Sequence, residues 1–279
     1  MSPASPAGGV AQASRSEMVS RPGGEGLVRW WEPRGEAIAS LVIAHGYAEH
    51  SGRYEAVGAR LAASGLAVWT TDVRGHGRAS GERASVAAIG DLVDDVHAEV
   101  VRARAARPGL PLFLLGHSMG GLVATTLALA HQGELAGLIL SGPAVGDPSG
   151  IEPLLDLDPL PEVVLSSEML ARDLRVGADY DADPLNYRGP FRRETLRALT
   201  GGARAVRGRF AELRLPLLVL HGAEDQLVVA AASEDLFAGA SSADKELTIY
   251  PGLRHEILNE PEGPEITDRI AGWVRAHVA

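Results

Sequence analysis

The sequence contains no cysteine among its 279 residues, which excludes disulfides, thiol nucleophiles, iron–sulfur clusters and zinc held by cysteine. Basic residues are fewer than acidic ones, 26 against 36, and the formal net charge is −10. Such an acidic chain is poorly suited to neutralising phosphates, so we expect no nucleic-acid partner. Long apolar runs are also missing: none approaches the roughly 20 residues of a membrane-spanning helix, and none resembles a secretory signal. We therefore expect a cytoplasmic protein, at most peripheral to a membrane.

What is present fits a globular protein of one large domain or two small ones. Hydrophobic residues make up 46% of the chain and charged residues 22%, the balance typical of a folded domain with its own core. Residues 1–26 differ from the rest, because they are rich in Pro, Ala, Ser and Gly. Such a stretch cannot bury enough apolar surface to offset its ordering entropy. We expect residues 1–26 to be disordered.

Short apolar runs alternate with longer amphipathic stretches from Val28 onward. The runs predict buried strands at 41–44, 67–70, 111–115, 138–140, 217–220 and 247–250. The stretches predict helices at 54–64, 89–106, 121–131, 230–238 and 264–277. Strands that are apolar throughout and alternate with helices indicate an α/β fold with a mainly parallel central sheet flanked by helices.

The alternation stops between residues 143 and 214. This stretch has several prolines and scattered apolar clusters but no clear strand. A structureless loop of that length is improbable inside a compact domain. We therefore predict an inserted helical cap, or lid, at 143–214, between two parts of an α/β core at 27–142 and 215–279.

A candidate nucleophile lies at the junction of one predicted strand and one predicted helix. There the chain reads Gly116-His-Ser118-Met-Gly120. A serine on a sharp strand-to-helix turn needs flanking positions without side chains, because the backbone there is strained and crowded. The turn exposes the hydroxyl and places it at a helix N-terminus, which favours negative charge. Ser118 is the predicted nucleophile.

A serine hydroxyl needs an imidazole to accept its proton. On this architecture the expected order along the chain is serine, acid, histidine. Of the histidines after Ser118, His131 lies on the helix that begins at the nucleophile, His221 ends a strand and His277 lies in the final helix. His255 lies instead in the loop between the last strand and the last helix, where catalytic groups gather. We predict His255 as the base.

The imidazole in turn needs a carboxylate to fix its tautomer. Asp225 follows the strand at 217–220 and is our predicted acid. Its neighbour Glu224 is one alternative, and Asp147, in the loop after the strand at 138–140, is another.

An oxyanion hole completes the predicted site. One donor is expected to be the backbone N–H of Met119, the residue after the nucleophile. The second is expected from the loop after the strand at 41–44, where Gly46 lets the chain turn and the N–H of Tyr47 can face the developing charge.

Several segments together resemble the α/β-hydrolase fold and, within it, the monoacylglycerol lipase and lysophospholipase-like group of serine hydrolases. The segments are 45–54 (HGYAEHSGRY), 72–77 (DVRGHG), 116–121 (GHSMGG), 221–225 (HGAED) and 251–256 (PGLRHE). The resemblance implies the same nucleophile, acid, base and oxyanion donors, a mobile cap that opens toward lipid, and a bracing role for His50 and Arg53. One departure is Ala48, where the group usually has glycine. If that position needs a positive φ, alanine is strained there.

The combined reading predicts a hydrolase of lipid carboxylic esters, with monoacylglycerol as substrate and an acyl-enzyme on Ser118. Such chemistry needs no cofactor and no metal, and no cluster in the sequence has metal-ligand spacing. A general carboxylesterase or a lysophospholipase is the main alternative, and an acyltransferase or a catalytically silent binding protein are further ones. Apolar clusters in the 143–214 segment suggest transient contact with a micelle or membrane surface. The sequence leaves the oligomeric state open.

Overall fold

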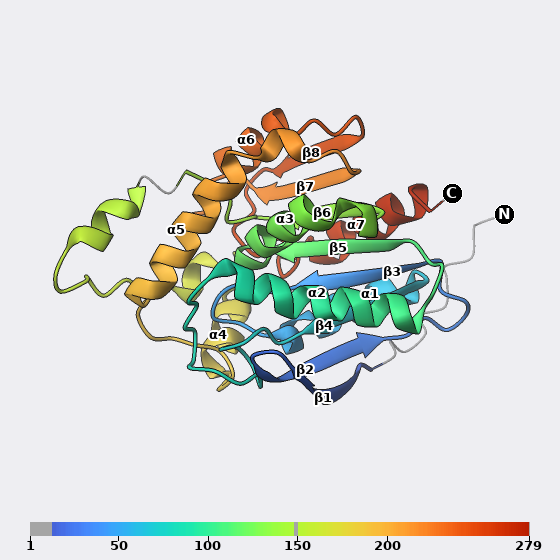
Figure 1. The fold of residues 1–279 in the computed structure, drawn as a ribbon, viewed down its shortest axis with the longest axis horizontal. Coiled ribbons are helices and arrows are strands. Elements are labelled where there is room, and N and C mark those ends of the chain that lie inside the picture. The colour runs from blue at the N-terminus through green and yellow to red at the C-terminus, as the bar shows by residue number, and fades with distance from the viewer. Residues whose placement is uncertain (1–12, 148–149, 279) are drawn as a thin grey trace.

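An eight-stranded sheet runs through the protein in the computed structural model, which describes residues 13–147 and 150–278 (Figure 1). The strand order is β1-β2-β4-β3-β5-β6-β7-β8. The strands are β1 Arg15–Arg21, β2 Gly24–Trp31, β3 Ala39–Ala44, β4 Leu66–Thr71, β5 Leu112–His117, β6 Gly137–Ser141, β7 Leu217–Gly222 and β8 Lys245–Tyr250. β3 to β8 pair in parallel, whereas β1 and β2 pair antiparallel. The predicted mainly parallel sheet is confirmed.

Helices cover both faces of the sheet. They are α1 Glu55–Ala63, α2 Ile89–Ala106, α3 Met119–His131, α6 Ala231–Gly239 and α7 Gly263–Ala276. α2, α3 and α6 contribute to one apolar core, and α1 and α7 contribute to the other. Every residue of β3 to β7 is buried, which explains why these strands are apolar throughout. None of the helices in the described part of the chain is long and apolar enough to cross a membrane.

The N-terminal hairpin corrects the expectation of disorder at 1–26. β1 pairs with β2, and β2 pairs with β4 of the main sheet. Most side chains of β1 are exposed. The prediction relied on buried apolar side chains, whereas β1 is stabilised by backbone hydrogen bonds to β2. Arg21 adds hydrogen bonds to Thr71 Oγ1 at 2.8 Å and to the Asp72 carbonyl at 2.5 Å. The expectation is wrong for 15–26, and residues 1–12 lie outside the described part of the chain.

The chain between β6 and β7 forms short helices at the edge where the parallel strands end (Figure 1). They are η4 Glu152–Asp156, η5 Ser167–Met169, α4 Leu174–Ala182, α5 Arg193–Arg207 and η6 Phe210–Glu212. Backbone hydrogen bonds join this segment to loops of the core. Tyr187 N donates to the Ala48 carbonyl at 2.9 Å, and Glu256 N donates to the Leu170 carbonyl at 2.7 Å. These contacts link the segment to the loops that follow β3 and β8.

An acid buried under the hairpin makes the stability of the fold depend on pH. Glu99, on α2, is 2% exposed, and its Oε1 has no hydrogen-bond partner among the described residues. Burial raises the pKa of Glu99 to about 8, although Arg102 and Arg21 oppose the shift. The folded protein therefore holds a proton that the unfolded chain releases near its ordinary pKa. Stability contributed by this proton is lost as pH rises from about 4.5 to about 8.

Replacing Glu99 with glutamine removes this pH-dependent cost. We expect E99Q to be more stable than the wild type at pH 8 by about 1–4 kcal/mol, because one pKa unit corresponds to about 1.4 kcal/mol. The difference should shrink as pH is lowered to 5. Urea unfolding curves at the two pH values measure it, and an equal difference at both would contradict a protonated Glu99.

Candidate active site

The backbone at Ser118 is strained in the way that a nucleophile turn requires. Ser118 joins β5 to α3 with φ 54° and ψ −120°, a conformation rarely adopted by residues other than glycine. A Cβ added at Gly116 would lie 2.4 Å from the Gly120 carbonyl oxygen, and one added at Gly120 would lie 2.1 Å from that of Ala44. Both glycines are therefore sterically required, as the sequence pattern predicts.

Asp225 and His255 come together from the loops after β7 and β8. His255 Nδ1 lies 2.6 Å from Asp225 Oδ2, and both side chains are buried. Burial opposes ionisation of Asp225, but hydrogen bonds from His221 and His255 hold its pKa well below its usual range. Burial would likewise lower the pKa of His255, but the hydrogen bond and charge of Asp225 outweigh it and raise that pKa above 6.5. The pair is arranged as an imidazole oriented by a carboxylate.

The end of β6 contacts both Ser118 and the His255–Asp225 pair. Ser118 N donates to the Ser141 carbonyl at 3.0 Å. A Cβ added at the next residue, Gly142, would lie 3.4 Å from both Asp225 Oδ2 and His255 Nδ1. No hydrogen bond among the described residues joins the Ser118 hydroxyl to His255. Contacts of this kind often tighten only when a substrate binds.

The residue before the nucleophile also touches the imidazole. The rings of His117 and His255 lie 4.8 Å apart between centroids, tilted by 49°. His117 Nδ1 donates to the Ser141 carbonyl at 3.0 Å. Burial and the neighbouring His255 lower the pKa of His117 to about 4. His117 therefore stays neutral near pH 7 and leaves Asp225 as the partner of His255.

The two residues predicted to supply the oxyanion donors lie at the nucleophile turn and in the loop after β3. Met119 begins α3 directly after Ser118, and Tyr47 lies in the loop after β3. That loop contacts the nucleophile, because a Cβ added at Gly46 would lie 3.3 Å from Ser118 Cβ. The hydrogen bonds described for this structure leave the N–H groups of Tyr47 and Met119 unused, whereas Gly46 N donates to Glu49 Oε1 at 2.6 Å. Tyr47 and Met119 remain the predicted donors.

The residue that departs from the usual loop pattern has a positive φ. Ala48 has φ 64°, so the condition for strain is met, at a cost of about 1–2 kcal/mol for a residue with a Cβ. Its carbonyl accepts hydrogen bonds from the Tyr180 hydroxyl at 3.1 Å and from Tyr187 N at 2.9 Å. The Tyr47 ring stacks on Phe191 at 4.4 Å. The 143–214 segment therefore holds this strained loop in place.

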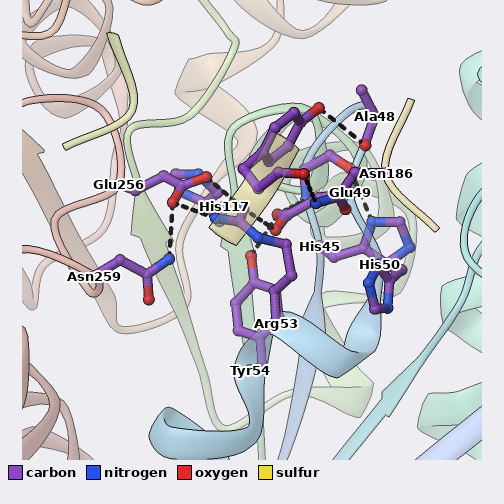
Figure 2. Close-up of polar contacts among 12 residues, drawn as sticks. His45, Ala48, Glu49, His50, Arg53, Tyr54, His117, Asn186, Glu256 and Asn259 are labelled. Atoms are coloured by element: carbon purple, nitrogen blue, oxygen red, sulfur yellow. Dashed lines mark hydrogen bonds and ion pairs between the residues drawn. The ribbon is translucent and has the colours of Figure 1, made fainter. Parts of the chain in front are cut away.

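A buried ionic network connects the loops after β3 and β8, as Figure 2 shows. Arg53 lies between two carboxylates, 2.8 Å from Glu49 and 2.5 and 2.8 Å from the two oxygens of Glu256. Burial opposes the charge on Glu49, but Arg53 and nearby histidines lower its pKa to about 2. Tyr54 donates to Glu49 Oε1 and Asn259 donates to Glu256 Oε2, both at 2.8 Å. Because Glu256 follows His255 and Glu49 holds Gly46, the network couples the position of the base to the oxyanion loop.

The resemblance assigned a bracing role to both His50 and Arg53. His50 Nδ1 accepts from Gly52 N at 3.1 Å, and its Nε2 lies 2.9 Å from Asp183 Oδ2. His50 thus joins the oxyanion loop to the 143–214 segment, and Arg53 joins it to the loop of the base. Sequence reasoning missed Glu49 and Glu256, although the adjacency of Glu256 to the predicted base was an available signal.

The alternatives left open by the sequence lie elsewhere. Glu224 and Asp147 are both exposed, and the hydrogen bond described for His255 goes to Asp225. His277 contacts Asp244 and His131 contacts Glu134. His221 contacts Asp225 without being the base.

The fold also groups three side chains of metal-binding type that the sequence analysis did not single out. His131 and Glu134 are three residues apart and His97 lies 37 residues before Glu134, and the potential ligand atoms of all three lie within 4.8 Å of one another. This cluster is at the opposite end of α3 from Ser118.

Fold and geometry together define an α/β hydrolase with a serine nucleophile turn. A family profile described as serine aminopeptidase S33 (Hydrolase_4) matches residues 35–262, and the chain belongs to this family. It is 38% identical to a monoacylglycerol lipase of Mycolicibacterium smegmatis, covering 89% of this chain and 92% of the relative. It is 34% identical to human monoglyceride lipase, over 87% and 82% of the two chains.

Solved structures show the same fold. A soluble variant of the monoglyceride lipase of Saccharomyces cerevisiae, in complex with a substrate analog, superposes with a TM-score of 0.83 at 23% identity, covering 99% of this chain and 100% of that one.

Proposed function

We propose that the protein hydrolyses carboxylic esters of lipids, with monoacylglycerol as substrate and glycerol and a fatty acid as products. The observation that carries the proposal is the strained Ser118 turn beside the buried His255–Asp225 pair. The similarity to lipases of monoacylglycerol supports the substrate class. We place the enzyme in the cytoplasm, in transient contact with membrane surfaces.

The proposed reaction has two steps. Ser118 Oγ attacks the ester carbonyl while His255 accepts its proton, and the negative oxygen is held by the N–H groups of Tyr47 and Met119. The protonated His255 then gives its proton to the leaving alcohol, which leaves an acyl-enzyme on Ser118. Water, deprotonated by His255, repeats the attack and releases the fatty acid.

A hydrolysis panel tests the substrate class. Monoacylglycerols, diacylglycerols, lysophospholipids and short soluble esters are compared at equal concentration by kcat/KM. The proposal expects monoacylglycerols to be the best lipid substrates. Preference for soluble esters would indicate a general carboxylesterase, and preference for lysophospholipids a lysophospholipase. Ester products formed from an added alcohol would indicate an acyltransferase, and turnover of no ester would indicate a binding protein.

We further propose that residues 143–214 form a cap that contacts the lipid surface. Within this segment Ile151, Leu157, Val164 and Leu174 are exposed, Leu174 by 73%. Exposed apolar side chains that gather on one segment are typical of a surface that meets another apolar phase. The contacts of Tyr180, Tyr187 and Asp183 with the oxyanion loop provide a route by which cap movement would reach the site.

Making this surface polar should affect lipid substrates selectively. We expect the double variant L157S/L174S to lose about threefold to tenfold in activity on micellar monoacylglycerol, since a buried Leu side chain contributes about 1.5–3 kcal/mol and only part of each reaches the lipid. Activity on a soluble short-chain ester should be unchanged. V101S, a similarly exposed position on α2, is the matched control. Equal losses on both substrates would contradict a lipid-facing cap.

A further inference from the structure

A second imidazole contacts the carboxylate that orients His255. His221, on β7, is fully buried, and its Nε2 lies 3.0 Å from Asp225 Oδ2 and 2.7 Å from the Val228 carbonyl. Because both of these atoms are acceptors, Nε2 carries a proton and donates it. Nδ1 lies 2.6 Å from Ser233 Oγ, which fixes the ring orientation. The same carboxylate oxygen therefore receives N–H groups from His221 and His255.

Sharing that oxygen changes what Asp225 does for the base. Each hydrogen bond to a carboxylate disperses its charge and lowers its proton affinity. Asp225 Oδ1 is already occupied by Leu227 N and Val228 N at 2.8 and 2.9 Å. The N–H of His221 thus competes with that of His255 for the remaining oxygen, and it weakens the stabilisation of a positive charge on His255.

Other charged groups face the pair but are fixed by their own partners. Glu256, beside the base, is held by Arg53, and so is Glu49 from the loop after β3. His117, from β5, contacts the imidazole and stays neutral near pH 7. A substitution of His221 would therefore change the charge that Asp225 presents to His255, and it would leave the ionic network intact.

We propose that His221 is a positioning residue that limits how strongly Asp225 stabilises protonated His255, and so sets the pH above which the enzyme is active. The proposal rests on the proposed esterase function. In wild type, activity requires neutral His255, so kcat/KM should rise with pH through an acidic limb whose midpoint lies above pH 6.5, the direction in which the pKa of His255 is shifted.

The test compares the acidic limb of kcat/KM on a soluble ester in three variants. H221M/S233A removes the N–H donor together with its buried hydroxyl partner. The midpoint of its acidic limb should shift to a higher pH by about 0.5–1 unit. H221Q keeps an N–H near the same place and should retain the wild-type midpoint. S233A alone removes the hydroxyl that orients the His221 ring, and its midpoint should shift to a higher pH by a smaller amount.

The outcomes separate the two proposals. An upward shift in H221M/S233A or S233A, with the wild-type midpoint in H221Q, supports a role through the charge of Asp225. A lower plateau with no shift in any folded variant overturns it in favour of simple packing. Absence of ester hydrolysis in the wild type would instead refute the proposed function.

An independent observation concerns the far end of α3. His97 on α2, His131 at the end of α3 and Glu134 in η2 Gln132–Glu134 form a cluster on the surface. His97 Nε2 lies 3.1 Å from Glu134 Oε2, and His131 Nδ1 lies 3.0 Å from Glu134 Oε1. The two rings stack at 4.1 Å. α3 has 13 residues, so the cluster is about 18 Å along the helix from Ser118.

The three side chains are close enough to share one ion once the stacked imidazole rings turn toward it, since their potential ligand atoms lie within 4.8 Å of one another. With metal–ligand bonds of about 2.0–2.2 Å, neighbouring ligand atoms lie about 3.0–3.5 Å apart, and each imidazole nitrogen already lies 3.0 or 3.1 Å from one of the two Glu134 oxygens. The three residues are 27%, 35% and 30% exposed in their side chains, which leaves a path for an ion and room for water ligands. Arg104, 3.5 Å from Glu134, is 48% exposed and free to turn into solvent.

We propose that His97, His131 and Glu134 bind a divalent transition-metal ion such as Zn²⁺, with each neutral imidazole keeping its proton on the nitrogen that faces away from the ion, and that the ion ties α2 to the end of α3. Two imidazoles and one carboxylate suit zinc, whereas Mg²⁺ prefers oxygen ligands only.

Equilibrium dialysis of the full chain against Zn²⁺ and against Mg²⁺ tests this site. We expect one Zn²⁺ per chain and no Mg²⁺, with binding about tenfold or more weaker in H97Q and in H131Q. H277Q, which removes a histidine of another surface cluster, is the matched control and should bind as the wild type does. No bound Zn²⁺, or equal binding in both variants, overturns the proposal, and ester hydrolysis should be unchanged in all three.

Discussion

Replacing Ser118 with alanine is expected to lower kcat on p-nitrophenyl butyrate by at least about 10⁴-fold, to the residual rate that binding and oxyanion contacts alone support. The variant lacks the only atom able to form the acyl-enzyme. Release of p-nitrophenol followed at 405 nm, or any equivalent continuous assay, measures the loss.

The fold should survive this change. The Ser118 hydroxyl forms no hydrogen bond among the described residues, and alanine keeps the Cβ whose strain the turn already accommodates. We therefore expect the urea midpoint of S118A to match that of the wild type. Undiminished turnover in a folded S118A would show that another group performs the attack.

Replacing Asp225 with asparagine is the second large effect, expected to lower kcat by about 10⁴-fold, the loss seen when the equivalent change is made in a serine protease triad. An asparagine amide facing His255 Nδ1 donates where the carboxylate accepts. It would favour the tautomer with a proton on Nε2, which cannot take the proton of Ser118. kcat measured on a soluble ester at the plateau of the wild-type pH profile tests this directly.

Glu224 provides the matched control for this variant. It neighbours Asp225 but is exposed, so E224Q removes the same charge from the same loop without touching His255. We expect E224Q to keep nearly wild-type kcat. Equal losses in the two variants would mean that loop charge, and not the contact at 2.6 Å, matters.

The features that could be predicted from the sequence are those that a local pattern of residues determines. Strands buried on both faces are apolar throughout, so β3 to β7 could be located by their runs. The turn at Ser118 could be located because steric crowding requires glycine at Gly116 and Gly120. The parallel arrangement then brought the loops with Asp225 and His255 to one edge, since carboxyl ends of parallel strands share an edge.

What the sequence missed depends on contacts between distant segments. β1 is an edge strand with exposed side chains, so its backbone pairing left no apolar signal. Arg53 and Glu256 pair across 203 positions, and charged residues are expected on the surface unless a partner is known. His221 was considered only as a base, because its contact with Asp225 requires the turn of the loop between them.

The most direct measurement of the central claim is the site of covalent labelling by a fluorophosphonate ester, mapped by peptide mass spectrometry. The account predicts a single adduct on Ser118, formed in the wild type and in H221Q and strongly slowed in D225N. A label on any other residue, or no label on an enzyme that hydrolyses esters, would contradict it.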